Sequence, residues 1–348
     1  MTATTKSAPR GGIGPGKVLL VTGSYPPDAC GVGDHSHGLV EGLARAGVPV
    51  TVYCRKDWSV FTVLKHYRAW RAARVDAIIL VHPTDGYRKS PAPNFALSLP
   101  LRARKLVILH EYTRKSLAGK LACYLFFLFA DRIAFTSEIE QDAAVGAAPW
   151  IGRRTAVIPL PSNIPVRDRQ APRIDVAYFG LIRPGKGIEE FLDMLEAATL
   201  PATTRIRLIG QSVTGLEDYA VAIGARLTAL GGEMMTNLSA TEVADLLAAT
   251  RVVALAFPDG ISRRRSSALA AMANGALVLT TPARNDHDLF DRICVMAPDA
   301  GAMAGRLVEV LADPDRFRSV ADAGMAFARS QTWDMVVSAC QDLIWTGD

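Results

Sequence analysis

The sequence is poor in cysteine and contains no closely spaced pair of cysteines. Five of the 348 residues are cysteine, an odd number, and none forms a CxxC motif. Disulfide frameworks and structural zinc sites are built from paired cysteines, so we expect neither. Isolated thiols are typical of a reducing compartment, which predicts a cytoplasmic protein. The five are Cys30, Cys54, Cys123, Cys294 and Cys340.

Long apolar segments are also missing. The most apolar run is LACYLFFLFA at residues 121–130, whereas a helix needs about 20 apolar residues to span a bilayer. The first sixteen residues lack the apolar core of a signal peptide, and we interpret residues 1–16 as a flexible tail. We therefore expect no transmembrane segment.

Several common binding signatures are absent as well. The chain has no GxGxxG dinucleotide fingerprint, no P-loop and no DNA- or RNA-binding motif. Its net charge of +5 is mildly basic, and lysines and arginines occur throughout the sequence. Such a charge suits phosphorylated small molecules, an anionic membrane surface or nucleic acid, and does not choose among them. Since no nucleic-acid motif is present, we expect no nucleic-acid partner.

The chain instead alternates short apolar runs with segments of helix length. KVLLVTG at residues 17–23 is the first predicted strand, and a helical pattern over residues 34–46 follows its loop. TVYC, DAIILVH, KLVILHE and DRIAFTS are further strand candidates. Continuous apolar runs between helices are typical of a parallel sheet that is covered on both faces.

A segment rich in proline and charge, residues 160–175, interrupts this alternation, which then restarts. We predict two doubly wound, Rossmann-like α/β domains, residues 17–165 and 166–330. A C-terminal helix within residues 331–348 is expected to pack back on the N-terminal domain. Ligands of such sheets bind beyond the carboxyl ends of the strands, so the cleft between two facing domains is the expected site.

Two loops in the N-terminal half carry candidate site residues. In GSYPPDACGVGD, Gly31 and Gly33 would let the backbone approach a bound ligand closely. Asp34 is a suitable N-cap for the next helix. The alternative is an ordinary glycine-rich turn. In VILHEYTRKS, His110 and Glu111 end an apolar strand and are expected to face the cleft. The alternative for His110 is a polar residue that is satisfied within the fold.

Two loops in the C-terminal half are rich in cations. In FGLIRPGKGIEEFL, Arg183 and Lys186 precede a helix N-terminus, an arrangement that suits a diphosphate. GISRRRSSALAAMANG at residues 260–275 places arginine and serine at the mouth of another helix, where the helix dipole and guanidinium groups favour an anion. The alternative for each loop is a solvated turn. The candidates in the second loop are Ser262, Arg264, Arg265, Ser266 and Ser267.

The segment WSVFTVLKHYRAWRAAR at residues 58–74 predicts a basic helix with Leu64 and Trp70 on one side. Two interpretations stay open for it. One is peripheral attachment to anionic lipid, and the other is a helix that covers the sheet. We prefer the sheet-covering interpretation.

The order of these motifs resembles the retaining, nucleotide-sugar-dependent glycosyltransferases of family 4, which have the two-domain GT-B fold. YPPDACGVGDHSHGLVEGLARAGVPVTVY is similar to their N-terminal glycine loop and first helix. LHEYTRKS resembles the segment with a donor-side histidine, and FGLIRPGKGIEEFL resembles their phosphate loop. GISRRRSSALAAMANGALVLTTP is similar to their donor motif, so the resemblance runs from Lys17 to the end of the chain.

The sequence departs from this family at two motifs. The family's donor motif has two glutamates separated by seven residues, the second of which binds the nucleotide ribose, whereas Ser262 and Ala270 stand here. Alanine cannot accept a hydrogen bond, so the ribose contact must come from elsewhere. The arginine that follows the phosphate-loop glycine is replaced by Leu181, with Arg183 as its substitute. We interpret the chain as a divergent branch of the family.

The resemblance implies hexosyl transfer from a nucleoside diphosphate sugar to an acceptor hydroxyl, with retained configuration and without a metal or other cofactor. Such transfer serves glycan, polysaccharide or glycoconjugate synthesis. Lys186 and Arg183 would stabilise the leaving diphosphate, and His110 would contact the donor sugar. Asp34 and Glu111 are assigned to the acceptor side.

The resemblance leaves the acceptor open among a glycan, a lipid-linked molecule and a small molecule. It also leaves open whether the cytoplasmic protein makes peripheral contact with the inner face of the membrane. Two other functions are compatible with these motifs. One is a nucleotide-sugar epimerase of the same fold, and the other is a non-catalytic nucleotide-sugar or glycan-binding protein, which the lost glutamates suggest.

Overall fold

The computed structural model describes residues 16–28, 30–158, 160–284 and 286–346. Their contacts divide the chain into two compact units. The described residues up to Ile158, together with those from Val337 onward, form the N-terminal unit. The described residues between them form the C-terminal unit, so residues 160–165, predicted to end the first domain, belong to the second unit.

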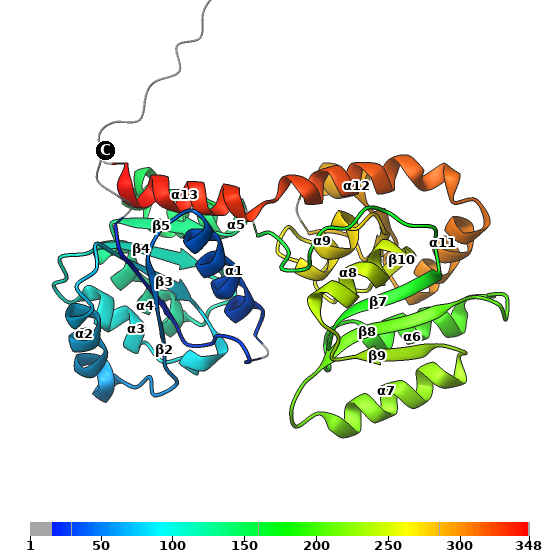
Figure 1. The fold of residues 1–348 in the computed structure, drawn as a ribbon, viewed down its shortest axis with the longest axis horizontal. Coiled ribbons are helices and arrows are strands. Elements are labelled where there is room, and N and C mark those ends of the chain that lie inside the picture. Colours follow the sequence, from blue (N-terminus) through cyan, green and yellow to red (C-terminus); the bar gives the residue numbers. More distant parts are fainter. Residues whose placement is uncertain (1–15, 29, 159, 285, 347–348) are drawn as a thin grey trace, which may run out of the picture. The chain divides into compact units, whose positions relative to one another are not determined.

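The N-terminal unit is built on a six-stranded sheet in which every neighbouring pair is parallel (Figure 1). The spatial order is β2-β1-β3-β4-β5-β6. Every residue of β1 and of β3 is buried, as expected for a parallel sheet covered on both faces. The strands are β1 (Val18–Thr22), β2 (Val50–Cys54), β3 (Ala77–His82), β4 (Arg104–Leu109), β5 (Arg132–Phe135) and β6 (Thr155–Val157).

Helices cover both faces of this sheet. One core cluster joins alternate strand residues such as Leu19 and Val21 to buried side chains of α2, α3 and α4. Helix α1 packs against β1, β2 and β3. The elements are α1 (Gly31–Arg45), η1 (Val60–Thr62), α2 (Val63–Ala72), η2 (Asp85–Tyr87), α3 (Ala92–Ser98), α4 (Leu117–Phe129), α5 (Glu138–Ala147) and η3 (Pro149–Arg154).

Helix α1 begins three residues earlier than the sequence pattern predicts. Its N-cap is Cys30, in an extended conformation, and Gly31 is its first residue. The prediction that Asp34 caps this helix is therefore wrong. Asp34 instead lies in the first turn, where the helix dipole favours a carboxylate.

The C-terminal unit repeats the architecture with a second six-stranded parallel sheet, in the order β12-β11-β10-β7-β8-β9 (Figure 1). Its strands are β7 (Ile174–Ile182), β8 (Ile206–Ser212), β9 (Glu233–Thr236), β10 (Thr250–Leu255), β11 (Leu277–Thr280) and β12 (Val295–Met296). Its helical elements are α6 (Ile188–Ala197), α7 (Glu217–Ala229), α8 (Ala240–Ala248), α9 (Ser266–Ala273), α10 (His287–Ile293), α11 (Ala300–Ala312), η4 (Asp315–Phe317) and α12 (Arg318–Ser330).

The last helix, α13 (Trp333–Trp345), joins the N-terminal unit from Val337 onward. There the Nη1 of Arg104, at the start of β4, donates a hydrogen bond of 2.9 Å to the carbonyl of Ile344. Among the described residues, every helix is too short or too polar to cross a lipid bilayer.

Each sheet contains a switch point, at which the chain changes the direction in which it adds strands. In the N-terminal unit it lies between β1 and β3, and in the C-terminal unit between β7 and β10. Open α/β sheets bind ligands beyond the carboxyl ends of the strands at such a point. The fold therefore directs attention to the loops that follow these four strands.

Candidate functional site

At the switch point of the C-terminal unit, the loops after β7 and β10 pack directly on each other. Gly187, between β7 and α6, has a φ of +82°, and a Cβ atom there would lie 2.0 Å from the carbonyl oxygen of Ala256. Only glycine fits such a position, because it has no Cβ and adopts positive φ without strain. The glycine thus fixes the loop that carries Lys186 against the start of the loop that carries the arginines.

The backbone of Lys186 is anchored from inside the unit. The hydroxyl of Tyr178, on β7, donates a hydrogen bond of 3.1 Å to the Lys186 carbonyl. The Lys186 side chain is half-buried, whereas Arg183 is exposed at the end of the strand. This geometry places a lysine directly before the N-terminus of α6, where unpaired N–H groups favour an anion.

Two carboxylates moderate the positive charge of this loop. Glu189 and Glu190 lie in the first turn of α6. Glu189 accepts a hydrogen bond of 2.7 Å from the hydroxyl of Tyr219. Because these acids offset Arg183 and Lys186, the net charge of the loop does not by itself define an anion site. The assignment of this loop as an anion site therefore rests on the position of Lys186 before the N-terminus of α6.

The arginine loop is tied down by local partners. The Arg263 Nε donates to Asp286 at 3.0 Å. Arg265 forms an ion pair with Asp259, and its guanidinium lies 4.3 Å from the centre of the Phe257 ring. Arg265 therefore stabilises the conformation of its own loop, a structural role beside the predicted contact with an anion.

The remaining candidates of this loop follow the same turn. Ser262 accepts a backbone hydrogen bond of 3.0 Å from Arg265 through its carbonyl. Arg264 is half-buried. Ser266 and Ser267 are the first two residues of α9. Their assignment to a bound donor stays a prediction.

Ala270, at the position of the family's ribose-binding glutamate, is fully buried in α9. Its carbonyl accepts a hydrogen bond of 3.0 Å from the side chain of Asn274, within the core of the unit. This position therefore offers a ligand no polar side chain.

A pocket of about 370 Å³ opens beside these loops, at the carboxyl ends of β10, β11 and β12. Its lining combines the flat apolar surfaces of Phe257 and Pro258 with carboxylates on three separate elements. The carboxylates are Glu190, Asp259 and Asp299. Such a lining can hold a ring by its faces and accept hydrogen bonds from its hydroxyl groups. Sequence reasoning missed all three carboxylates.

At the switch point of the N-terminal unit, the loops after β1 and β3 are also locked together. The backbone N–H of Gly23 donates to the Thr84 hydroxyl at 3.0 Å. A Cβ atom at Gly86 would lie 1.7 Å from the carbonyl oxygen of Gly23. A Cβ at Gly33 would lie 3.1 Å from the Ser24 carbonyl oxygen, whereas one at Gly31 would meet nothing within 4 Å. Close packing therefore explains why residue 33 is a glycine. It does not explain the glycine at position 31, which is exposed.

Buried histidines gather at the carboxyl edge of this sheet. His110, directly after β4, has its ring centre 4.8 Å from that of His35 on α1, and the rings meet edge to face. Its backbone N–H donates to the carbonyl of His82, the last residue of β3, at 2.8 Å. Burial lowers the pKa of His35 to about 4. Burial also lowers the pKa of His82 well below its ordinary value, with a contribution from Lys115.

At neutral pH His35 and His82 are therefore uncharged imidazoles, which can donate or accept a hydrogen bond. Sequence reasoning singled out His110 and missed the other two. His82 ends an apolar run in the same way as His110, so the same signal applied to it. His35 has no such signal, because it lies within a helix.

Acidic residues flank the histidines. Asp34 is half-buried, and burial raises the pKa of its carboxyl above the ordinary value, an effect that His37 partly offsets. Glu111 is half-buried after His110. The buried carboxylate of this region is Glu140, which accepts hydrogen bonds from the backbone N–H groups of Tyr112 and Thr113 at 2.6 and 2.8 Å. Glu140, which sequence reasoning also missed, thus fixes the loop that follows His110.

A larger pocket, of about 460 Å³, lies elsewhere in the N-terminal unit, at the amino ends of β4 and β5. Its arginines bond to the fold, as Arg154 does to the carbonyls of Phe127 and Ala130 at 2.6 and 2.7 Å. Because this is the edge opposite to the one where doubly wound sheets bind ligands, we do not assign it to the site.

No protein-family model matches the chain, and no curated protein matches it. Solved structures do match nearly its whole length. HepE from Anabaena, in complex with UDP and glucose, aligns at a TM-score of 0.72 and 17% identity, over 95% of this chain and all of that one. Sucrose-phosphate synthase from Thermosynechococcus elongatus aligns at 0.67 and 17%, over 94% and 98%. AviGT4, a glycosyltransferase involved in avilamycin A biosynthesis, aligns at 0.59 and 16%, over 95% and 97%. With two Rossmann-like units, the chain has the predicted GT-B fold.

Proposed function

We propose that this protein is a glycosyltransferase that moves a sugar from a nucleoside diphosphate sugar to an acceptor hydroxyl. The observation that carries the proposal is the Gly187–Ala256 junction. It holds a lysine before a helix N-terminus, next to loops that line a pocket of about 370 Å³. HepE, which has the same fold, is seen in complex with UDP and with UDP-glucose, which supports a uracil nucleotide as the first donor to test.

Within the pocket, we propose that carboxylates replace the missing family glutamate. Ribose hydroxyls need acceptors, and Glu190, Asp259 and Asp299 are the carboxylates that line the pocket. Asp259 is paired with Arg265 and Asp299 caps α11, so Glu190 is our first choice for the ribose. The apolar surfaces of Phe257 and Pro258 are suited to the base.

The chemistry follows from where charge develops. As the glycosidic bond of the donor breaks, negative charge builds on the departing diphosphate. Lys186, supported by Arg183 and the dipole of α6, is proposed to stabilise it there. Membership of family 4, retention of configuration, hexosyl specificity and independence of a metal are parts of the proposal that rest on the motif resemblance.

The buried histidines are proposed to serve a sugar. An imidazole can donate a hydrogen bond to a hydroxyl group or accept one from it, and His110 is the histidine that the motif resemblance assigns to a sugar contact. Asp34 and Glu111 stay our candidates for the acceptor. We propose a cytoplasmic enzyme in peripheral contact with a membrane.

Lys186 is the only lysine between residues 159 and 336, which makes the donor site open to a chemical test. An amine-reactive reagent is applied to the whole protein with UDP, GDP, ADP or dTDP, and labelling is read by peptide mass spectrometry. We expect one diphosphate to protect Lys186, while the matching nucleoside protects it much less. Lys56, an exposed lysine of the N-terminal unit, is the control.

A parallel thermal-shift series separates site from function. A ligand at 100 times its dissociation constant stabilises a protein by about 2.7 kcal/mol. A diphosphate that raises the melting temperature without protecting Lys186 would contradict the assigned site and leave nucleotide binding intact. Absence of both effects for every nucleotide tested would overturn the donor proposal.

Two other functions differ from the proposal in what they do to a donor. An epimerase of the same fold converts the donor without an acceptor, and a binding protein leaves it intact. The buried Ala270 favours the binding protein, since a family ligand residue is lost there. Incubation with nucleotide sugars, with and without acceptors, distinguishes the three, because only a transferase releases diphosphate faster when the acceptor is added.

A further inference from the structure

Three helices form a continuous layer on one face of the N-terminal sheet. The Tyr67 hydroxyl on α2 donates to the carbonyl of Pro100, just after α3, at 2.9 Å. The side-chain amide of Asn94 on α3 donates to the carbonyl of Ala122 on α4 at 3.0 Å. Helix α2 therefore packs on α3, and α3 on α4 (Figure 1).

The outer surface of this layer displays large apolar side chains. Phe61 in η1 is 94% exposed and Leu117 in α4 is 75% exposed. On α4 the exposed leucines are spaced by four and seven residues, which places them on one side of the helix. The exposed apolar residues of the layer are Val60, Phe61, Leu64, Phe95, Leu117, Leu121, Leu128 and Phe129.

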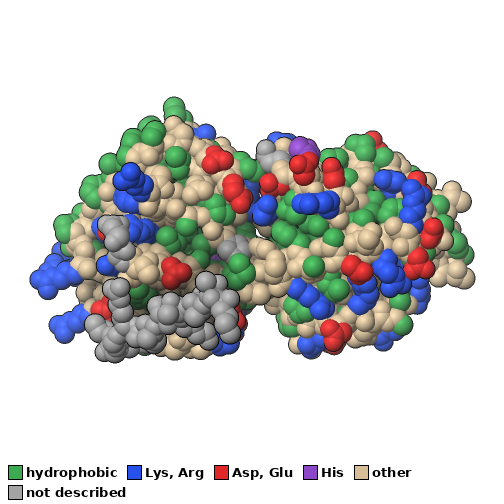
Figure 2. All heavy atoms as spheres, turned by 90° about the horizontal axis from the view of Figure 1, so that it is seen from above, with side chains coloured by type: hydrophobic (Ala, Val, Ile, Leu, Met, Phe, Trp, Pro, Cys, Tyr) green, Lys and Arg blue, Asp and Glu red, His purple; other side chains and the backbone are tan. Residues whose placement is uncertain are grey.

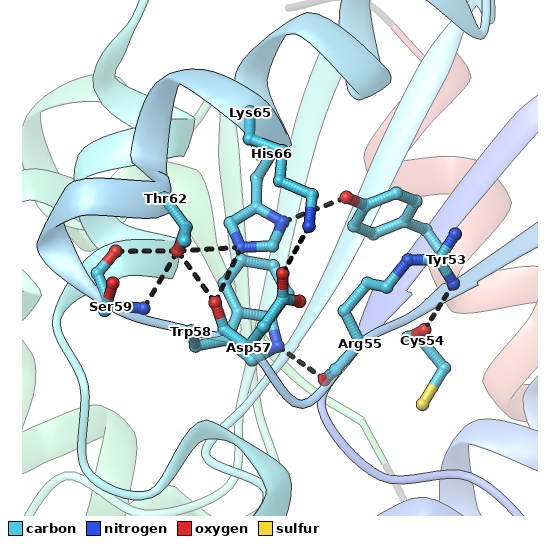
Figure 3. Close-up of polar contacts among 9 residues, drawn as sticks. All are labelled: Tyr53, Cys54, Arg55, Asp57, Trp58, Ser59, Thr62, Lys65 and His66. Carbon is cyan, nitrogen blue, oxygen red and sulfur yellow. Dashed lines mark hydrogen bonds and ion pairs between the residues drawn. The ribbon is translucent and has the colours of Figure 1, made fainter.

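The apolar end of α2 is held firmly in place (Figure 3). The Trp58 ring stacks on His66 with 3.9 Å between ring centres. The Thr62 hydroxyl accepts a hydrogen bond of 2.9 Å from the backbone N–H of Ser59, and Tyr53 bonds to the His66 Nδ1 at 2.9 Å. The exposed Phe61 next to them is thus displayed by an ordered turn.

The sheet-covering interpretation of residues 58–74 is confirmed, and it does not exclude attachment to lipid. His66 and Trp70 are the buried side of α2 and cover the sheet, as we preferred. Leu64, expected on the same side as Trp70, is instead 57% exposed. Helix α2 therefore has one apolar side for the core, and Leu64 lies outside that side, three and four residues after the exposed Phe61 and Val60 of η1.

The segment of the sequence that includes this layer carries a net positive charge, although Lys65 on α2 pairs with Asp57 just before it. Residues 58–130 contain twelve lysines and arginines and three acids, a net charge of +9, while the rest of the chain contains 27 and 31, a net charge of −4. On the C-terminal unit, basic and acidic side chains are mixed over the face shown in Figure 2. Helices α2, α3 and α4 contain no acid, and their four bases are Lys65, Arg68, Arg71 and Lys120.

We infer that the outer surface of α2, α3 and α4, the apolar–basic surface, docks on an anionic phospholipid bilayer. Its apolar side chains enter the interfacial region, and its lysines and arginines meet the headgroups. A second copy of the chain fits less well, because a twofold contact through this surface sets the same cations against each other. The inference names the surface for the proposed membrane contact, and it favours a lipid-linked acceptor. It does not depend on sugar transfer.

The test is co-sedimentation of the purified protein with vesicles. We expect binding to vesicles of phosphatidylcholine with 30% phosphatidylglycerol, weakening as salt is raised, and little binding to phosphatidylcholine alone. The double variant Phe61→Ser/Leu64→Ser should lower the apparent partition coefficient by at least about tenfold, because it removes two apolar side chains from the interface. The variant Arg68→Glu/Arg71→Glu should lower it similarly.

Matched controls lie on the C-terminal unit. Val221→Ser changes a side chain that is 70% exposed on α7, and Arg316→Glu/Arg318→Glu changes the net charge by the same amount as the charge-reversal pair. Both should bind like the wild type, and circular dichroism verifies that all variants are folded. Equal loss in variants and controls, or no difference between the two kinds of vesicle, would overturn the inference. The inference would also be overturned if the wild type does not bind vesicles and light scattering shows a dimer that the variant Phe61→Ser/Leu64→Ser dissociates. The surface would then be a contact between two copies of the chain.

Discussion

At the scale of single residues, Arg265 shows how a cation can serve the fold of a loop. Its ion pair with Asp259 and its contact with the Phe257 ring are local. We predict that Arg265→Ala lowers the free energy of unfolding by about 1–2 kcal/mol, a value reduced for the partial exposure of both side chains. Urea unfolding followed by circular dichroism measures this.

The control for Arg265 is Arg318→Ala, which removes an exposed pair with Asp315 and should change stability little. Arg265→Ala with unchanged stability but weaker nucleotide binding would contradict the structural role and restore the original interpretation of this arginine as an anion ligand.

His35 makes the stability of the N-terminal unit depend on pH. Its pKa falls from an ordinary 6.5 to about 4 on folding, so the unfolded chain takes up its proton first. Neutral, buried His35 therefore contributes up to about 3 kcal/mol to the free energy of unfolding. This contribution is complete above about pH 6.5 and is lost as the pH falls towards 4. His82 acts in the same direction.

Tryptophan fluorescence suits this measurement, because four of the five tryptophans belong to the N-terminal unit. Between pH 7.5 and 5.0 the urea midpoint should fall, and less in His35→Phe than in the wild type. His287→Gln, an exposed histidine of the other unit, is the control and should keep the wild-type dependence. Identical pH dependence in His35→Phe and wild type would refute the assignment.

Residue-level partners were the least predictable feature from sequence. The apolar run before His110 predicts that this histidine lies at the end of a strand. Its neighbour His35 is 75 residues away in sequence, and the two rings meet only in the folded unit, where His35 lies on α1 and His110 follows β4. The same applies to Glu140, which bonds to a loop 28 residues earlier.

At the scale of elements, the turn between β7 and α6 positions the proposed donor site. Gly185 and Gly187 both have positive φ, but only Gly187 has a neighbour where a Cβ would stand. Gly185→Ala should therefore cost about 1 kcal/mol, the price of the left-handed backbone alone. Gly187→Ala should cost several times more, since the two loops must separate.

Differential scanning calorimetry of the two glycine variants measures the difference, and each variant is the other's control. Nucleotide affinity should fall in Gly187→Ala and persist in Gly185→Ala. Equal costs, or equal affinities, would show that the junction with Ala256 does not organise the site.

Element boundaries followed the sequence only in part. The alternation of apolar runs predicted the strands except β6, because parallel strands buried on both faces need such runs, whereas β6 is short and only half-buried. The start of α1 was missed by three residues, since Cys30 adopts the extended N-cap conformation although its side chain makes no capping hydrogen bond. Because cysteine is not one of the residue types preferred at an N-cap, the sequence does not indicate this helix start.

At the scale of the whole molecule, the two Rossmann-like units were predictable from the repeated alternation on either side of a proline-rich segment, and the GT-B fold from the motif resemblance. The pocket carboxylates were not, because they come from three elements that meet only in the folded unit. The apolar–basic surface could be predicted from the sequence only in part. The sequence pattern of residues 58–74 indicated an apolar helix face, but not that α3 and α4 extend it.

The most direct test of the central claim is the rate at which the protein releases nucleoside diphosphate from a nucleotide sugar, for the wild type and Lys186→Ala. We predict release from at least one donor, accelerated by an acceptor, and a turnover about 10²- to 10³-fold lower in a folded Lys186→Ala protein, the loss typical for one preorganised stabilising group. Lys186→Arg should recover part of it, because a guanidinium differs in shape from an ammonium. Turnover of Lys186→Ala within about threefold of wild type would contradict the diphosphate role of Lys186, and no release from any donor would contradict the proposed activity itself.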